Sequence, residues 1–159
     1  MPAHTAIKLS FLVGLLDSWD STNGSPAPDL LFITIDGNLV ATLTTNNASG
    51  SVTDFGGGTL IVNGAQVDSN QFYTDTLLDM SSAPWTSFAH SASSITIGFQ
   101  AGGAGWQGGT DEAWGVDNLT ISVSSEGAVP EPASWAMMLG GLGIIGAAMR
   151  RRRTALSFG

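Results

Sequence analysis

The chain has 159 residues, with thirteen acidic and five basic side chains and a formal net charge of −8 at pH 7. This length suffices for one domain with a hydrophobic core and excludes two ordinary domains. Cysteine is absent, which excludes disulfides and thiolate chemistry. The four arginines occupy positions 150–153, so residues 1–149 have one lysine and a charge of −12, which disfavours nucleic acid as a partner.

The elements expected in chain order are short strands. Residues 6–13 alternate apolar and polar side chains, the pattern of a strand with one buried face. Residues 30–35 and 39–44 flank the turn Asp36-Gly37-Asn38 and predict a hairpin. With roughly eight or nine short strands and no amphipathic helix before the C-terminal tail, the pattern predicts an antiparallel β-sandwich, of the jelly-roll type. The remaining strands are expected at residues 52–55, 59–62, 71–78, 86–90, 94–100 and 116–123.

Two acidic loops lie next to the ends of these predicted strands. Carboxylate oxygens are the ligands that Ca²⁺ prefers, and the first and last strands of a jelly roll often lie side by side. We therefore expect a structural calcium ion, although the spacing is not that of an EF-hand. The alternative is that the same aspartates form turns and cap loops. The candidate ligands are Asp17, Asp20, Asp29, Asp111, Glu112 and Asp117.

The sequence indicates a protein without catalytic activity. His4 and His90 are the only histidines, and neither lies in a nucleophile motif or a metal-binding pattern. A glycoside hydrolase would need two carboxylates facing one cleft, but adjacent strand residues such as Asp111 and Glu112 point to opposite faces. Trp106 lies in a glycine-rich segment, where an exposed indole could stack on a sugar ring; burial in the core is the alternative.

The C-terminal tail combines an apolar stretch with a basic end. Residues 133–149 contain no charge and would form a helix of about 25 Å, near the short end of the range that spans a bilayer. Basic residues remain in the cytoplasm, so the arginines predict that residues 1–130 lie outside it. A buried helix of a soluble domain is the alternative. The basic membrane stop consists of Arg150, Arg151, Arg152 and Arg153.

The tail also resembles a known family. Pro130-Glu131-Pro132, followed by Trp135-Ala136, Gly141-Leu142-Gly143 and the arginines, resembles a PEP-CTERM sorting signal with a tryptophan-alanine pair after the proline motif. The same segment is also known as the ice-binding protein C-terminal domain. The resemblance implies a Gram-negative bacterium and an exosortase-type membrane protease that recognises Pro130, Glu131 and Pro132. It implies by itself neither ice binding nor catalysis.

Two motifs resemble secreted bacterial β-sandwich domains, which are similar to concanavalin-like or galactose-binding-like sandwiches. Asp111-Glu112-Ala113-Trp114-Gly115-Val116-Asp117-Asn118-Leu119 resembles their last strand, and Asp17-Ser18-Trp19-Asp20 resembles one of their loops. An exported protein should begin with a signal peptide, but residues 1–5 have neither a basic nor an apolar region of that kind. We therefore expect a truncated N-terminus, with the signal peptide missing ahead of Met1.

The expected organisation is a sandwich domain at 1–123, a linker at 124–129, the sorting signal at 130–153 with its transmembrane helix at 133–149, and a cytoplasmic tail at 154–159. The expected function is that of a non-catalytic envelope or extracellular-matrix protein. It would be held in the inner membrane by its C-terminus and then processed, to become surface-exposed or secreted. The alternative is a carbohydrate-binding module with an extracellular polysaccharide as its partner. A glycoside hydrolase-like enzyme is the least favoured alternative.

Overall fold

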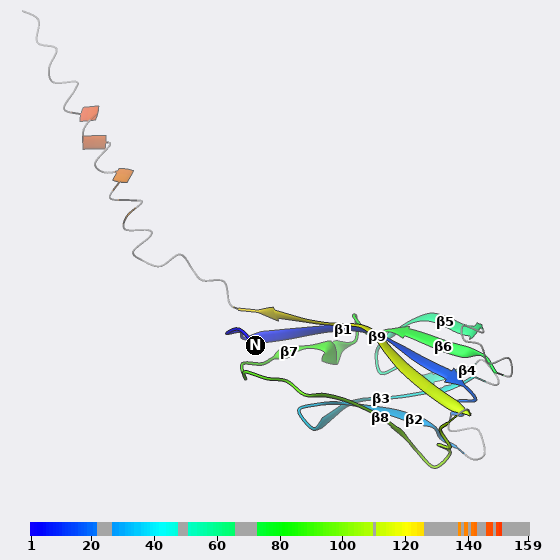
Figure 1. Ribbon diagram of the computed structural model, residues 1–159. Coiled ribbons are helices and arrows are strands. Elements are labelled where there is room, and N and C mark those ends of the chain that lie inside the picture. Colours follow the sequence, from blue (N-terminus) through cyan, green and yellow to red (C-terminus); the bar gives the residue numbers. More distant parts are fainter. Residues whose placement is uncertain are drawn as a thin grey trace, which may run out of the picture. The chain divides into compact units, whose positions relative to one another are not determined.

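The computed structural model describes residues 1–21, 27–47, 51–65, 73–109 and 111–125. In the C-terminal tail it describes positions 137, 139, 141–142, 146–147 and 149–150. The chain divides into two compact units, Met1–Ser124 and Ser125–Gly159. The first unit, called the body below, consists of two layers of antiparallel strands (Figure 1).

The first layer is a five-stranded sheet built around β1. β9 pairs with β1 from Ala6 to Asp17, so β6 and β7 share the opposite edge of β1, and β5 pairs with β6. Its strands are β1 (Ala6–Asp17), β5 (Thr59–Ala65), β6 (Asp75–Asp79), β7 (Ser87–Ala89) and β9 (Glu112–Ser124), with a short 3-10 helix, η1 (Pro84–Thr86), before β7.

The second layer is a four-stranded sheet in the order β4-β3-β2-β8. Asp36 and Gly37 connect β2 to β3 with positive φ angles of 48° and 80°, as a tight turn that follows the twist of the strands requires. The strands are β2 (Leu30–Ile35), β3 (Asn38–Asn46), β4 (Ser51–Asp54) and β8 (Ile97–Gly102).

The hydrophobic core lies between the two sheets. Every second side chain of β1 from Ile7 to Leu15 is at most 1% exposed, as the alternation of apolar residues predicts. Leu31 and Ile33 of β2 are buried opposite them. The ring of Phe11 packs at 6.0 Å from Trp85 of η1 and edge-on at 5.5 Å from Phe99 of β8, which joins the two layers.

The predicted all-β sandwich of antiparallel sheets is confirmed, and β2 has the predicted bounds. Three strands begin later than predicted: β6 begins at Asp75, β7 at Ser87 and β8 at Ile97. Ile95 therefore precedes its strand, where it is half-buried against the core. β2, β3 and β4 are consecutive neighbours in one sheet, and the jelly-roll connectivity stays a prediction.

Most of the sorting signal lies outside the described residues, including Pro130, Glu131, Pro132 and three of the four arginines, Arg151 to Arg153. The described positions of the tail have helical backbone. Within the described part of the chain, no helix has both the length and the apolar character needed to cross a bilayer. The transmembrane helix at 133–149 stays a prediction.

Candidate functional site

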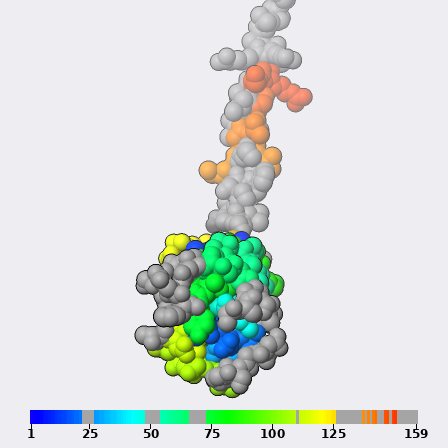
Figure 2. Space-filling model, turned by 90° about the vertical axis from the view of Figure 1, so that its right-hand side faces the viewer, coloured from blue at the N-terminus to red at the C-terminus, as the bar shows by residue number. Residues whose placement is uncertain are grey.

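Three acidic segments meet at one end of the body. β1 ends at Asp17, which lies opposite Glu112 at the start of β9, and Asp29 directly precedes β2. Figure 2 shows the body from this end, where blue atoms of the first segment lie close to yellow-green atoms of the segment that leads into β9. We call Asp20, Asp29, Asp111 and Glu112 the acidic cluster.

Hydrogen bonds hold the three segments of the acidic cluster together. Ser18 donates to Asp111 from its backbone nitrogen to the carbonyl oxygen at 3.0 Å, and its hydroxyl lies 2.8 Å from that oxygen and 2.9 Å from Oδ1. Asp20 and Asp29 are joined reciprocally: the Asp29 nitrogen donates to the Asp20 carbonyl at 2.8 Å, and the Asp20 nitrogen to Asp29 Oδ2 at 2.7 Å. Oε2 of Glu112 accepts the backbone N–H of Gln107 at 2.9 Å.

Trp19 fixes the loop between the first two acidic segments. Its side chain is fully buried, and its indole nitrogen donates to the carbonyl of Ala113 at 2.7 Å. The ring of Trp106 packs 5.4 Å from that of Trp19, and the Trp106 side chain is half-buried, between the two alternatives of an exposed indole and burial in the core. A large aromatic side chain next to a buried indole gains more from burial than from solvent contact. Sugar binding by Trp106 stays a prediction.

Charge repulsion and burial perturb two carboxyls of the acidic cluster. Asp29 is 0% exposed, and burial raises its pKa to about 6, with further contributions from the negative charges of Glu112, Asp20 and Asp111. The pKa of Asp20 is also raised, by burial first and by Asp111 second. Oδ1 of Asp29 is buried and accepts no hydrogen bond from any described residue. A buried carboxylate oxygen without a donor is costly unless a proton or a cation neutralises it.

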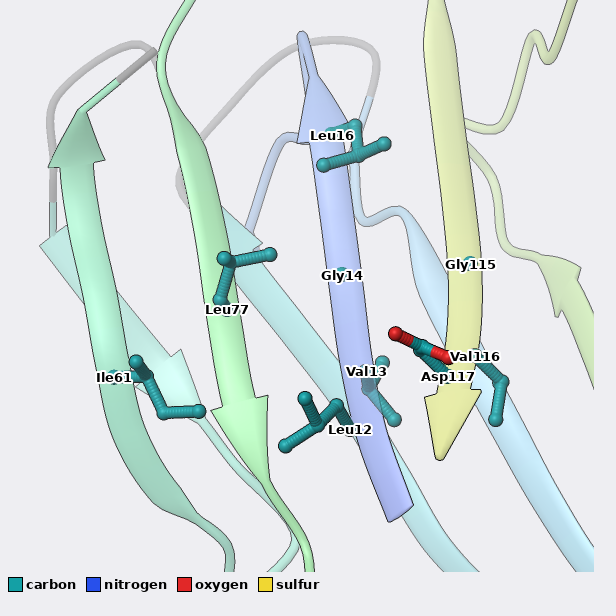
Figure 3. A pocket seen from close by; sticks show the side chains of 9 residues that line it. All are labelled: Leu12, Val13, Gly14, Leu16, Ile61, Leu77, Gly115, Val116 and Asp117. Atoms are coloured by element: carbon teal, nitrogen blue, oxygen red, sulfur yellow. The ribbon is translucent and has the colours of Figure 1, made fainter. Parts of the chain in front are cut away.

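Two of the six predicted calcium ligands lie outside the acidic cluster. Asp17 is buried at the end of β1, where its backbone N–H donates to a carboxylate oxygen of Asp75 at 3.1 Å. Asp117 lies on the outer face of the five-stranded sheet, beside an apolar groove of about 420 Å³ (Figure 3). Gly14 and Gly115, paired in register, form the floor of this groove. Its apolar walls come from Leu12, Leu16, Ile61 and Leu77.

No group of three or more histidine or acidic side chains among the described residues is already arranged as a metal site. The alternative expected for the candidate ligands, in which they cap loops, has support within the acidic cluster, since Asp29 accepts from the nitrogen of Asp20 at 2.7 Å and Glu112 from that of Gln107 at 2.9 Å. Calcium binding by the acidic cluster stays a prediction.

A second polar group at the opposite end of the body was not predicted from the sequence. His4 Nε2 and His90 Nδ1 are 2.7 Å apart, His4 Nδ1 is 2.7 Å from the carbonyl of Pro2, and His90 Nε2 is 3.7 Å from a carboxylate oxygen of Asp36. The two histidines meet because β7 pairs with the start of β1, Ala89 opposite Ala6. Only the strand pairing, which joins residues more than eighty positions apart, could have indicated this contact.

The comparisons with known proteins concern the tail. The family model of the PEP-CTERM protein-sorting motif matches residues 128–153, which confirms the resemblance noted for Pro130-Glu131-Pro132 and the residues after it. The chain therefore has a sorting signal of the kind that exosortases process, which implies export to the cell envelope or the extracellular space. No curated protein and no solved structure matches the chain.

Proposed function

We propose that the chain is an exported, non-catalytic protein of the cell envelope or extracellular matrix. The observation that carries this proposal is the sorting motif at residues 128–153. An exosortase-type protease recognises Pro130-Glu131-Pro132, and the apolar segment at 133–149 holds the chain in the inner membrane until the protease acts. The proline-rich motif, the uncharged segment and the arginines follow each other in the order that this route requires.

Mass spectrometry of the mature C-terminus tests the proposed route. The full-length chain is expressed in a Gram-negative host with an exosortase, and its C-terminus and cell fraction are determined. We expect a C-terminus near Pro132 and an envelope or extracellular location. Replacing Pro130, Glu131 and Pro132 with alanine should leave the tail attached, while the matched control Glu126→Gln should be processed normally. A full-length product that stays soluble in the cytosol would contradict the proposal.

We further propose that the acidic cluster binds a structural calcium ion. The buried Oδ1 of Asp29, which accepts no hydrogen bond from any described residue, supports this proposal, because a cation beside it would remove an electrostatic cost. Asp20, Asp29, Asp111 and Glu112 would supply the ligand oxygens. The bound ion would neutralise their mutual repulsion and tie the loop after β1 to the start of β9.

Thermal unfolding of the full-length chain with and without calcium tests this second proposal. At a calcium concentration of about 100 times Kd, binding should stabilise the native state by about 2.7 kcal/mol and raise Tm measurably. Asp20→Asn should abolish most of this increase. Asp117→Asn, which removes the same charge away from the acidic cluster, should retain it. An unchanged midpoint in the presence of a chelator would refute calcium binding.

The carbohydrate-binding alternative depended on an exposed Trp106. The half-buried position of that side chain against Trp19 does not favour it. A pull-down with extracellular polysaccharide, comparing the unmodified chain with Trp106→Ala, distinguishes the alternatives. Retention that is lost in the variant would support a glycan site at this position.

A further inference from the structure

A pocket of about 370 Å³ lies at the end of the body opposite the acidic cluster, and we call it the histidine-end pocket. β2 and β3 contribute one side of it through the turn at Asp36, while η1 and β7 contribute the other. The pocket therefore opens between the two sheets. Its wall includes Ile35, Asp36, Val40, Trp85, Phe88 and His90.

Two polar groups on the wall of this pocket, the His90 ring and the Asp36 carboxylate, present acceptors to it, while Asn38, which also lines it, donates from its side-chain amide to the Asp36 carbonyl at 3.5 Å. The Pro2 carbonyl can only accept, so Nδ1 of His4 bears the proton; a neutral His4 then accepts at Nε2 from Nδ1–H of His90. Nε2 of a neutral His90 is left as an acceptor, buried and without a hydrogen bond to any described residue. It lies 3.7 Å from Oδ2 of Asp36, which is also an acceptor. Two facing acceptors repel each other unless a proton on Nε2 or a ligand with donors lies between them.

The positions of these acceptors are fixed before any ligand binds. The His90 side chain is only 8% exposed, and its ring stacks on His4 with 5.0 Å between ring centroids. Asp36 is held at the turn because its Oδ1 accepts the backbone N–H of Thr96 at 2.8 Å. The Asp36 side chain is 45% exposed, so a ligand can reach its second oxygen from solvent. Preorganised acceptors reduce the entropic cost of binding.

Aromatic and aliphatic side chains form the remaining wall. Trp85 and Phe88 are half-buried, and the indole nitrogen of Trp85 already donates to the carbonyl of Gly56 at 2.6 Å. The indole therefore offers the pocket its apolar ring surface and no donor. Aromatic faces attract cations, and residues 1–125 contain one lysine against eleven acidic residues, so the surrounding field also favours positive charge.

We propose that the histidine-end pocket binds the cationic end of an amine or guanidinium ligand. Asp36 and His90 accept its N–H groups, and Trp85 and Phe88 pack against it. A guanidinium or ammonium group brings several donors, a positive charge and no acceptor, which complements this wall. The cation can belong to an arginine or lysine side chain or to an amino sugar. The proposal depends neither on the sorting route nor on calcium binding.

Calorimetry with matched ligands tests the proposal on the full-length chain in a neutral detergent. With the α-amino group acetylated in both ligands, arginine amide should bind at least about tenfold more tightly than citrulline amide, which then has nearly the same shape but no charge. Comparing glucosamine with N-acetylglucosamine makes the same test for an amino sugar. The two comparisons together show whether the pocket takes the cation of a basic side chain or that of an amino sugar. Equal binding of the charged and uncharged partners, or binding of none, would overturn the proposal.

Variants and a direct readout locate the binding site. Asp36→Asn keeps an oxygen to accept from Thr96 but removes the charge, and it should weaken arginine amide binding about tenfold or more. Asp54→Asn, an exposed acid that also accepts a backbone N–H, should leave binding unchanged. In the unmodified chain, ligand addition should shift the NMR signal of the Trp85 indole more than those of Trp19 and Trp106. Shifts confined to other tryptophans, or equal affinity in both variants, would place the ligand elsewhere and refute the assignment.

Discussion

Asp29 is buried among three other carboxylates, and its titration affects the stability of the body. Its pKa is about 6 in the folded state and near 3.8 when unperturbed, so between these values the native state binds more protons than the unfolded state. The native state is therefore stabilised as pH falls from 7 towards 4. Because one pKa unit corresponds to about 1.4 kcal/mol, the titration of Asp29 changes the free energy of unfolding by at most about 3 kcal/mol.

We therefore predict that Asp29→Asn raises Tm at pH 7 in the absence of calcium, because it removes a buried negative charge that the folded state accommodates poorly. The gain over the unmodified chain should shrink as pH falls and disappear below about pH 3, where Asp29 is protonated in both the folded and the unfolded state. Thermal unfolding followed by circular dichroism across this range measures the effect. A variant less stable than the unmodified chain at pH 7 in chelator would contradict it.

Trp19 is expected to be the most important aromatic side chain for the loop that carries the acidic cluster. Trp19→Phe leaves the part-buried carbonyl of Ala113 without its donor and opens a small cavity beside the fully buried Trp19 position. We predict a loss of about 2–3 kcal/mol of unfolding free energy by denaturant titration. Trp106→Phe, at a half-buried position on the same ring pair, should cost less. Equal losses in both variants would show that Trp19 has no special role.

Among the elements, one glycine within a strand and one just after a strand should respond oppositely to alanine. A Cβ at Gly115 in β9 would meet no atom within 4 Å, so alanine should stabilise the strand by about 0.5–1 kcal/mol. Gly103, after β8, has a φ of 121°, and a Cβ there would collide with the carbonyl oxygen of Pro28. Gly103→Ala should therefore be strongly destabilising. Denaturant unfolding of both variants measures this, and the same sign of change in both would refute the argument.

Local sequence patterns predict some elements of the body, but not how distant strands pair. The alternation in β1 and the turn at Asp36-Gly37 depend on near neighbours, so the strand and the hairpin were predicted correctly. The pairing of β1 with β9 and of β2 with β8 joins distant residues, and no local pattern encodes it. The contact of His4 with His90 follows from such a pairing, and so it was missed.

The candidate calcium site was predicted only in part for a related reason. Glu112 and Asp117 both belong to the acidic motif at the start of β9, but they are five residues apart, and an odd separation places two strand residues on opposite faces. Glu112 is therefore buried at the end of the sandwich, whereas Asp117 lies at the outer groove. The alternation of side chains along a strand could have placed Glu112 and Asp117 on opposite faces of the sheet before the structure was known.

For the whole molecule, the arginines should decide which side of the inner membrane the body occupies. Replacing Arg150 to Arg153 with glutamine removes the basic residues that stay in the cytoplasm. We predict that a periplasm-dependent reporter fused ahead of Pro130 is active in the unmodified chain and loses most of its activity in this variant. Replacing Lys8 with glutamine is the control and should leave the reporter active. Unchanged activity without the arginines would show that orientation has another cause.

The tail continues directly from β9, the strand that pairs with β1 through eleven register positions. The two strands run antiparallel, and Ala6 and Ser124 lie opposite each other at the same end of the pair. A force that pulled these two ends apart would therefore release the hydrogen bonds between β1 and β9 one at a time, beginning at that end.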